Sequence, residues 1–394
     1  MRKSLLPFYV VAFLSEVVWM AIVPLAPTYA DRFDLSKVET GVVLAAAGFS
    51  TLVVSLPIGV LADRIGTRRL TLAASALVAA SSLGQALAFD FWSLLLARVV
   101  FGIALGAIWT AGLAWIADAV PDRRGASALG VPVTVAGLGI MTGPVFAGAL
   151  AGAFGLRTPF LVLAASAAAA TLMLARGGGH ETSFRHEPLL RTLRVARAHR
   201  IVLASCVVMA VIGLTNGGVN LLVPLSLRHD GFSPGGTGLV FSASSSIFVV
   251  ASIVLTRLGT RVVTLRVIGA AAIVYGATIL VLVSGTSSAL VVSFMLVRSP
   301  AWATLSTLSY PLGALGAERA DLGRGAVMGL LNLVWGAAST LGPVIAAGIA
   351  QAAGARSSFA TLAVLMAVTG VWLSSSGRRD RDELRRAAPS LDAS

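Results

Sequence analysis

Residues 64–68 read Arg64-Ile65-Gly66-Thr67-Arg68, and the same pattern returns as Arg257-Leu258-Gly259-Thr260-Arg261. Each stretch is short, basic and centred on glycine, and each interrupts a long apolar sequence. Two matching stretches this far apart indicate an internal duplication. The duplication decides the fold, because it divides the chain into two related halves.

Four further matches follow the same order at an offset of about 200 residues. They are Val23-Pro24-Leu25 with Val223-Pro224-Leu225, Arg98 with Arg298, Arg124-Gly125-Ala126 with Arg324-Gly325-Ala326, and Gly143-Pro144 with Gly342-Pro343. One such match in an apolar chain has little meaning, but five in one order are not plausibly chance. Parallel repeats of this kind are typical of secondary transporters, whose binding site lies between the halves near the membrane midplane.

The sequence between these repeated motifs is mostly apolar. Of the 394 residues, 57% are hydrophobic and 12% charged, whereas soluble domains carry about 25% charged residues. Runs of about 20 apolar residues are long enough to span a bilayer as helices. They predict spans at 6–28, 38–61, 70–89, 92–117, 127–152, 157–175, 201–227, 237–256, 262–284, 287–313, 326–352 and 357–376. The predicted fold class is all-α integral membrane, with twelve transmembrane helices in two pseudo-symmetric six-helix bundles.

The basic residues predict the orientation. Only five lie in the connections on one side, namely Arg32, Lys37, Arg157, Arg228 and Arg356. The excess on the other side places both termini in the cytoplasm. We therefore expect a six-helix bundle at 1–175, a cytoplasmic linker at 176–200 that forms an interfacial helix or a flexible connection, a second bundle at 201–376, and a disordered cytoplasmic tail at 377–394.

Several function classes are disfavoured. The net charge of +13 lies in short clusters between apolar runs, so no basic face for nucleic acid is expected. The two lysines lie outside any glycine-rich loop, which disfavours ATP hydrolysis. The spans carry none of the usual hydrolase constellations, and the four histidines have no metal-ligand spacing, so neither an enzyme nor a metal site is predicted.

Three motifs resemble those of the major facilitator superfamily. The stretch from Gly59 to Arg69 is similar to that family's loop between helices 2 and 3, with Thr67 where a basic residue is usual. Arg98 to Gly102 resembles its helix-4 motif. The run of Gly139, Gly143-Pro144 and Gly148 resembles the helix-5 motif of its twelve-helix drug:proton antiporters. The resemblance covers essentially the whole chain and implies transport by alternating access.

Glu16 is the one acidic residue near the middle of a predicted span. A charged carboxylate there costs at least ~2.5 kcal/mol and is rarely retained without a use. We therefore predict that Glu16 gains and loses the coupling proton; the alternative is a structural hydrogen bond. Asn216 occupies the equivalent position of the second half. The resemblance implies that Arg98 takes part in proton coupling, whereas Arg298 is long enough to snorkel outward.

The cavity for the substrate is predicted from residues that share helix faces with these two positions. They are Phe13, Trp19 and Met20 beside Glu16, Asn216 and Asn220 on the seventh span, and Asn332 and Trp335 on the eleventh. A carboxylate among aromatic and flexible apolar side chains suits a lipophilic cation. Ordinary helix packing is the alternative reading of each aromatic residue.

Two further groups have mechanical roles. Asp63, Arg64, Arg68 and Asp118 are predicted to gate the cytoplasmic side, with Asp63 facing the positive end of the eleventh helix. Gly139, Gly143, Pro144, Gly148, Gly342 and Pro343 are predicted to allow close helix packing and local bends.

The leading hypothesis is proton-coupled efflux of amphiphilic or cationic small molecules, including drugs, by a monomeric multi-pass protein of the cell (inner) membrane. The proton gradient supplies the energy, and no cofactor is expected. The expected partners are the lipid bilayer and a small-molecule substrate, without nucleic acid. The alternative is proton-coupled or facilitated uptake of a small metabolite, although the spans offer few of the polar side chains that sugar importers need.

Overall fold

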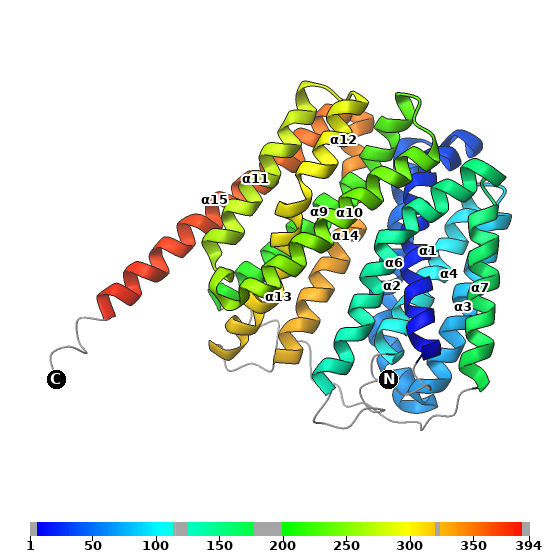
Figure 1. Ribbon diagram of the computed structural model, residues 1–394, viewed down its shortest axis with the longest axis horizontal. Helices are drawn as coiled ribbons and strands as arrows, with labels where there is room; N and C mark the ends of the chain where they lie inside the picture. Colours follow the sequence, from blue (N-terminus) through cyan, green and yellow to red (C-terminus); the bar gives the residue numbers. More distant parts are fainter. Residues whose placement is uncertain (1–5, 113–114, 116–124, 177–198, 320–323, 388–394) are drawn as a thin grey trace.

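The computed structural model describes residues 6–112, 115, 125–176, 199–319 and 324–387. The side chains at 56, 59, 60, 63, 125–133, 260, 318, 324–326 and 377–387 lie outside this description. All regular structure in the described part is helical (Figure 1). Twelve stretches of it are long and apolar enough to cross a membrane. The predicted all-α membrane architecture with twelve spans is confirmed.

The first six spans agree with the predicted segments to within about a turn or two. They are α1 (Leu6–Phe33), α2 (Lys37–Ile65), α3 (Thr67–Leu87), α4 (Phe91–Ala107) continued by the π-helical η1 (Ile108–Gly112), α6 (Gly125–Phe154) and α7 (Thr158–Arg176). A π-helix is rare and often marks a functional position. The described part of the fourth span therefore departs from regular geometry in its second half.

The second six spans repeat this order after the linker. They are α9 (Arg200–His229), α10 (Pro234–Leu258) followed by the short η3 (Gly259–Val262), α11 (Leu265–Ser284), α12 (Ser288–Val297) with α13 (Ser299–Arg319), α14 (Arg324–Ala353) and α15 (Ala355–Ala387). The tenth span is divided at Arg298, two residues before Pro300. Proline has no backbone N–H to donate, so an interruption there is expected.

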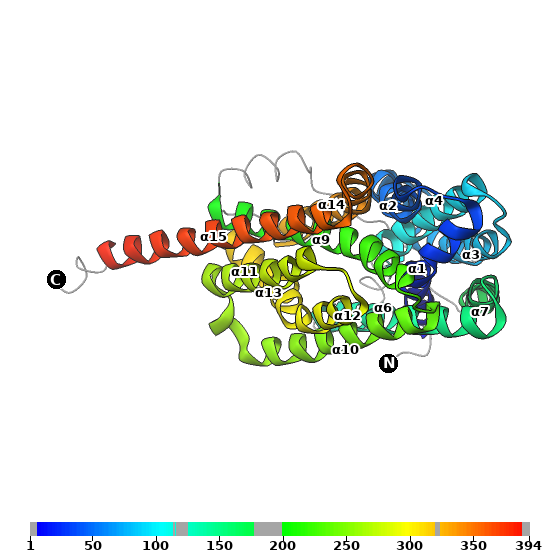
Figure 2. The same ribbon diagram turned by 90° about the horizontal axis from the view of Figure 1, so that it is seen from above.

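The two halves lie side by side (Figure 1). Helices α1–α7 form one bundle and α9–α15 the other, and the view from above shows α10 beside α6 and α14 beside α2 (Figure 2). We call the end of the molecule where α1 begins the near face, at the bottom of Figure 1, and the end where α1 finishes the far face. Of the predicted linker at 176–200, residues 177–198 lie outside the described residues.

The two glycine-centred repeats form equivalent turns at the near face. Gly66, between α2 and α3, has φ 92°, and Gly259, after α10, has φ 66°. Residues with a Cβ rarely adopt this left-handed region, whereas glycine does so at little cost. The chain therefore needs glycine at both positions to reverse direction in so few residues.

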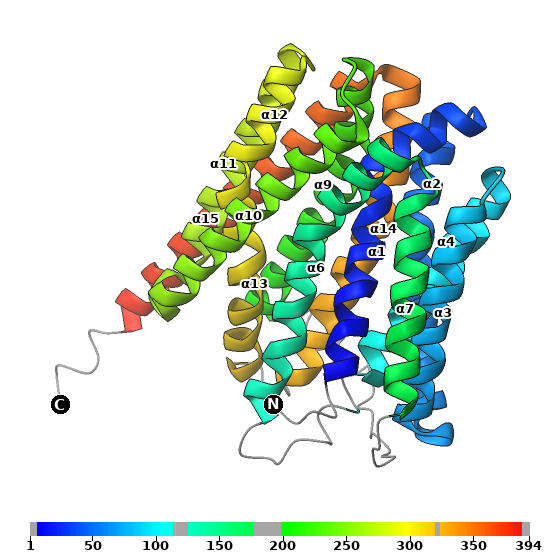
Figure 3. The ribbon, with the colours of Figure 1, turned by 45° about the vertical axis from the view of Figure 1, so that its right-hand side comes forward.

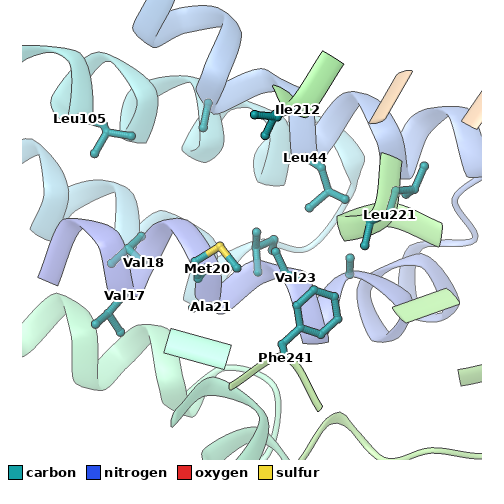
Figure 4. Packing of buried hydrophobic residues seen from close by; sticks show 14 of the residues in the cluster. Val17, Val18, Met20, Ala21, Val23, Leu44, Leu105, Ile212, Leu221 and Phe241 are labelled. Carbon is teal, nitrogen blue, oxygen red and sulfur yellow. The ribbon is translucent and has the colours of Figure 1, made fainter. Parts of the chain in front are cut away.

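One apolar core extends across both halves. Figure 4 shows Val17, Met20 and Val23 of α1 surrounded by side chains from α2, α4, α9 and α10. Leu44, Leu105, Leu221 and Phe241 are among those neighbours, and the same cluster continues through each bundle. Helix α1 is thus packed against its own bundle and against the second one.

The C-terminal end differs from the expectation of a disordered tail. Helix α15 continues to Ala387, so residues 377–387 are helical; its long red end is seen in Figures 1 and 2, and Figure 3 shows it partly behind other helices. The charges there alternate in sign at four-residue spacing, for example Arg379 with Glu383 and Asp382 with Arg386. Opposite charges at i,i+4 spacing stabilise a helix. Residues 388–394 lie outside the described part.

Candidate functional site

Glu16 is buried inside the first bundle, with 8% of its surface exposed. The indole Nε1 of Trp109 donates a hydrogen bond of 2.8 Å to its Oε1. Trp109 belongs to the π-helical segment η1, so the departure from α geometry in the fourth span occurs where that span meets Glu16. One indole N–H stabilises a carboxylate but brings no positive charge to it.

Helix α6 closes the other side of Glu16. A Cβ built on Gly139 would lie 2.8 Å from the Cβ of Glu16 and 2.6 Å from the carbonyl oxygen of Phe13. At the next turn, a Cβ on Gly143 would lie 2.9 Å from the carbonyl oxygen of Val17. Only glycine permits α6 to approach α1 this closely. The carboxylate is therefore held between η1 and α6.

Arg98 is also buried, with 1% of its surface exposed. Its Nε donates to the carbonyl oxygen of Val43 at 3.4 Å, while Nη1 is buried without a hydrogen-bond partner. Its guanidinium carbon lies 5.8 Å from the ring centroid of Trp19 and 5.4 Å from that of Phe101. Glu16 and Arg98, both in the described part of the chain, form no ion pair with each other.

The predicted cavity residues of α1 are engaged in packing. The Trp19 ring lies 6.4 Å from that of Phe101, and the β-carbon of Met20 lies against Gly143. Met20 is buried, and Phe13 and Trp19 are half-buried. In this conformation the Trp19 ring lies near the guanidinium of Arg98 and near Gly48 of α2, whereas Phe13 meets α6 through its carbonyl oxygen, at Gly139.

The equivalent place in the second half is a polar cluster. Nη1 of Arg298 donates to the hydroxyl oxygen of Tyr275 at 2.7 Å and to Oδ1 of Asn216 at 3.4 Å. The Tyr275 hydroxyl also donates to that Oδ1, at 3.4 Å. Arg298 is 2% exposed, so the expectation that it snorkels outward is wrong. The arginine turns inward, where a phenol and an amide accept hydrogen bonds from its Nη1.

The other predicted residues of the second half lie apart from this cluster. Asn220, one turn along α9 from Asn216, is half-buried. Asn332 of α14 is exposed and accepts a 2.5 Å hydrogen bond from the Tyr310 hydroxyl of α13. Trp335, one turn further on α14, is 36% exposed. No hydrogen bond between described residues connects this α13–α14 pair to the Arg298 cluster.

Each repeated Gly-Pro pair sits at a junction of three helices. Gly143 packs against α1 and Gly342 packs against α9, where a Cβ would lie 3.0 Å from the Cα of Gly217. The carbonyl oxygens of the prolines that follow face the opposite half: that of Pro343 meets Gly41 of α2, and that of Pro144 meets Gly238 of α10. Gly148 continues the second contact against Pro234. The duplication thus produces two related seals between the halves.

Polar contacts reinforce these seals toward the far face. Asp31 of α1 forms an ion pair of 2.8 Å with Arg228 of α9. Lys37 donates to the carbonyl oxygen of Ala350, and the Ser242 hydroxyl donates to that of Met141. Every hydrogen bond that described residues of one half make with described residues of the other lies in the far-face part of its helices.

The predicted gating residues lie at the near face. Nη2 of Arg68 donates to the carbonyl oxygens of Ala175 at 3.1 Å and Leu174 at 3.5 Å, at the end of α7. An arginine is favourable there because a helix C-terminus carries partial negative charge. Arg64 is exposed. The side chain of Asp63 and the whole of Asp118 lie outside the described part.

Sequence reasoning missed Trp109, Tyr275 and the Asp31–Arg228 pair. Trp109 follows Arg98 by eleven residues, which is three helical turns, so it shares a face with a residue already selected. Tyr275 is the one tyrosine in the otherwise apolar run of α11. Both signals were present in the sequence. The ion pair had none, because its partners belong to different halves.

Twelve spans in two pseudo-equivalent bundles, with their few charged groups buried inside, define a polytopic membrane transporter. The profile of the Major Facilitator Superfamily matches residues 8–323 and, in a second match, residues 206–391. The chain belongs to this family.

Two curated relatives are drug-resistance proteins. The chain is 26% identical over 151 residues to quinolone resistance protein NorA of Staphylococcus aureus (strain MRSA252). It is 28% identical over 155 residues to the multi-drug resistance efflux pump PmrA of Streptococcus pneumoniae serotype 4. Each match covers 38% of this chain and 39% of the relative, so the matched stretch spans about two fifths of the relatives' length.

The fold is also that of a solved transporter. A bacterial homologue of the human lysosomal transporter Spinster, in an inward-facing and unoccupied conformation, superposes with a TM-score of 0.78. The match covers 95% of this chain and 96% of that one at 16% identity. The structure of such a homologue in an inward-facing and occupied conformation superposes with a TM-score of 0.79. At this identity the likeness establishes the shared architecture.

Proposed function

We propose that the protein exports amphiphilic or cationic small molecules in exchange for protons, by alternating access. The observation that carries the proposal is the Glu16 carboxylate, which is buried inside the first bundle beside the indole of Trp109 and forms no ion pair with a described residue. A buried carboxylate without a positive partner is strongly disfavoured. It is therefore neutralised by a proton or by a cationic cargo, and the two compete for it.

The arrangement of the halves supports this cycle. The hydrogen bonds between described residues of the two halves hold the far face closed, and the arginine distribution predicts that the near face is cytoplasmic. Cargo would enter from the cytoplasm, displace the proton from Glu16 and favour the opposite conformation. A ligand shifts such an equilibrium only through its different affinity for the two states.

Uptake of a small metabolite is the second candidate function. The observation that favours it is the cluster of Asn216, Tyr275 and Arg298, because such hydrogen-bonding groups are what a polar nutrient requires. The two functions differ in the direction of net flux under an imposed proton gradient. If the protein allows a sensitive host to grow in the presence of a drug, efflux is supported. If the host needs the protein to grow on one nutrient, uptake is supported.

The deciding experiment replaces Glu16 with Gln in proteoliposomes that carry an imposed pH gradient. We expect pH-driven exchange of a cationic dye to be abolished, because glutamine occupies the same volume but cannot release a proton. The control variant is Gln85→Asn, at a buried residue of α3 that lies outside the site. It should leave the exchange rate unchanged. Unchanged exchange in Glu16→Gln would remove the central claim.

We also propose that Asp63 takes part in closing the near face. If Asp63 holds α2 against the start of α14 when the near face closes, Asp63→Asn should slow transport several-fold while the Kd for cargo stays nearly constant. A matching loss of cargo affinity would show that Asp63 binds substrate instead.

A further inference from the structure

The Arg298 cluster is a buried positive charge for which the described structure supplies no carboxylate. The described hydrogen bonds of the guanidinium engage Nη1, with Tyr275 and Asn216, and Nε, with the sulfur atom of Met295 at 3.3 Å. No hydrogen bond between described residues uses Nη2. The fork of the guanidinium is thus held from one side, with one nitrogen available to a ligand.

Aromatic rings surround this charge. The guanidinium carbon of Arg298 lies 4.8 Å from the ring centroid of Trp302, 5.6 Å from that of Phe294 and 5.7 Å from that of Tyr275. The Trp302 ring lies 4.2 Å from that of Phe248. Rings disperse a positive charge without neutralising it. They also provide a flat apolar surface of the kind that an aromatic cargo contacts.

The charges buried in the spans do not balance. Among the described residues, Glu16 is the one buried acidic group in the spans, whereas Arg98 and Arg298 are both buried within theirs. The excess is greatest when Glu16 carries a proton. Rings enclose both arginines, but the unpartnered Nη1 of Arg98 is fully buried, whereas no side-chain nitrogen of Arg298 is both fully buried and unpartnered among the described residues. Arg298 is therefore the charge better placed to meet a ligand.

We propose that Arg298, oriented by Tyr275 and Asn216, binds a carboxylate of the cargo. Resting on the proposed export function, this assigns the substrate class: a zwitterionic aromatic amphiphile, whose cation replaces the proton at Glu16 and whose carboxylate neutralises Arg298. A guanidinium pairs with a carboxylate through two parallel hydrogen bonds, which gives orientation as well as charge. The asymmetry between Glu16 and Asn216 then has a purpose, because each half recognises one end of the cargo.

The test compares two dyes that differ in one group. Tetramethylrhodamine with a free carboxylate is a zwitterion, and its methyl ester is a cation of nearly the same shape. The purified protein should bind the carboxylate dye at least fivefold more tightly than the ester, as measured by fluorescence polarisation. Equal affinity for the two dyes would overturn the proposal, whether or not the protein exports either.

The decisive variant is Asn216→Asp, which places a carboxylate at the atom that Arg298 already contacts. It should lower binding and efflux of the carboxylate dye about tenfold and change those of the ester less than twofold, because the internal carboxylate occupies the guanidinium. If the cluster only braces the bundle, the variant affects both dyes alike, and the proposal fails. The ester is the control for folding within each preparation.

A second variant keeps the test valid if Asn216→Asp fails to fold. Arg298→Lys keeps the positive charge but loses the planar fork, so it should weaken carboxylate binding by a smaller factor and again spare the ester. Equal weakening of both dyes in this variant also contradicts the proposal. If the parent shows carboxylate preference in binding but no proton-driven efflux, the site stands and the export function fails.

Discussion

Asp31 and Arg228 join the two halves of the transporter through an ion pair of 2.8 Å at the far face. Asp31 lies in the last turn of α1 and Arg228 in the last turn of α9, which are equivalent helices of the two repeats. Both side chains are about half exposed, at 55% and 45%. In the proposed alternating-access cycle the pair must separate whenever the far face opens, so we expect it to favour the conformation that is closed there.

The first prediction concerns this pair. Exposed ion pairs contribute roughly 0.2–1 kcal/mol, so Asp31→Asn should raise the population that is open at the far face by up to about fivefold. The measurement is the rate at which a membrane-impermeant maleimide labels Ala45→Cys in a Cys206→Ala background. Ala45 is buried and shares the α2 face of Gly41 and Gly48.

The charge swap is the control for that experiment. Asp31→Arg and Arg228→Asp should each accelerate labelling, and the two together should return the rate toward that of the parent. If Asp31→Asn labels at the parent rate, the ion pair does not hold the far face closed.

The second prediction concerns the glycine seal. A Cβ on Gly41 would lie 2.9 Å from the carbonyl oxygen of Pro343 and 3.0 Å from the Cβ of Ala347, so Gly41→Val should force α2 and α14 apart. The same Ala45→Cys reporter should label several-fold faster. Gly348→Val, on a part of α14 where a Cβ meets nothing within 4 Å, should leave the rate unchanged. Similar rates in the two variants would exclude a steric seal.

The third prediction tests the indole that faces Glu16. A hydrogen bond to a charged group contributes about 1.5–3 kcal/mol, so Trp109→Phe should slow proton-driven exchange by about tenfold or more. Its effect should become much smaller in a Glu16→Gln background, because the charged acceptor is then absent. Trp115→Phe, which alters a ring packed on Phe8, should change the rate little. A full effect of Trp109→Phe in both backgrounds would assign Trp109 a role independent of Glu16.

The fourth prediction is a pH dependence outside the membrane. Oδ2 of Asp230 accepts hydrogen bonds from the hydroxyl and the backbone N–H of Ser288, at 2.7 and 2.6 Å, which ties the end of α9 to the start of α12. The Ser288 hydroxyl, mainly, lowers the pKa of Asp230 below its ordinary value. A lowered pKa contributes stability above the unfolded value of about 3.9, and this is lost as the pH falls through the folded value.

Asp230→Asn should therefore lower the Tm of the purified protein at pH 7, and its difference from the parent should shrink at pH 3. Ser288→Ala should show a smaller difference with the same trend, because it removes one of the two hydrogen bonds. A difference that is the same at both pH values would mean that the Asp230 charge does not contribute to stability.

The spans and the duplication could be predicted because they depend on local sequence. Apolar length sets each span, and the glycine turns at Gly66 and Gly259 recur because both reverse the chain in the same way. The contacts of Glu16 and Arg98 could not. They depend on the π-helical segment that carries Trp109 and on how α6 approaches α1. Both features arise from packing between helices that are distant in the sequence. The helical tail was missed because a high density of charge was interpreted as disorder, although its spacing favours a helix.

The two Gly-Pro seals have a consequence for how such a protein changes over time. Their contacts are made largely by backbone atoms of positions 41, 144, 238 and 343, so they require the absence of a Cβ at 41 and 238 and no particular side-chain chemistry. Arg298, which we propose binds the cargo, and its partners Asn216 and Tyr275 are not among these four positions. Directed evolution can therefore randomise the residues around Arg298 while those four positions are kept. A change in substrate specificity then need not disturb the contacts between the halves.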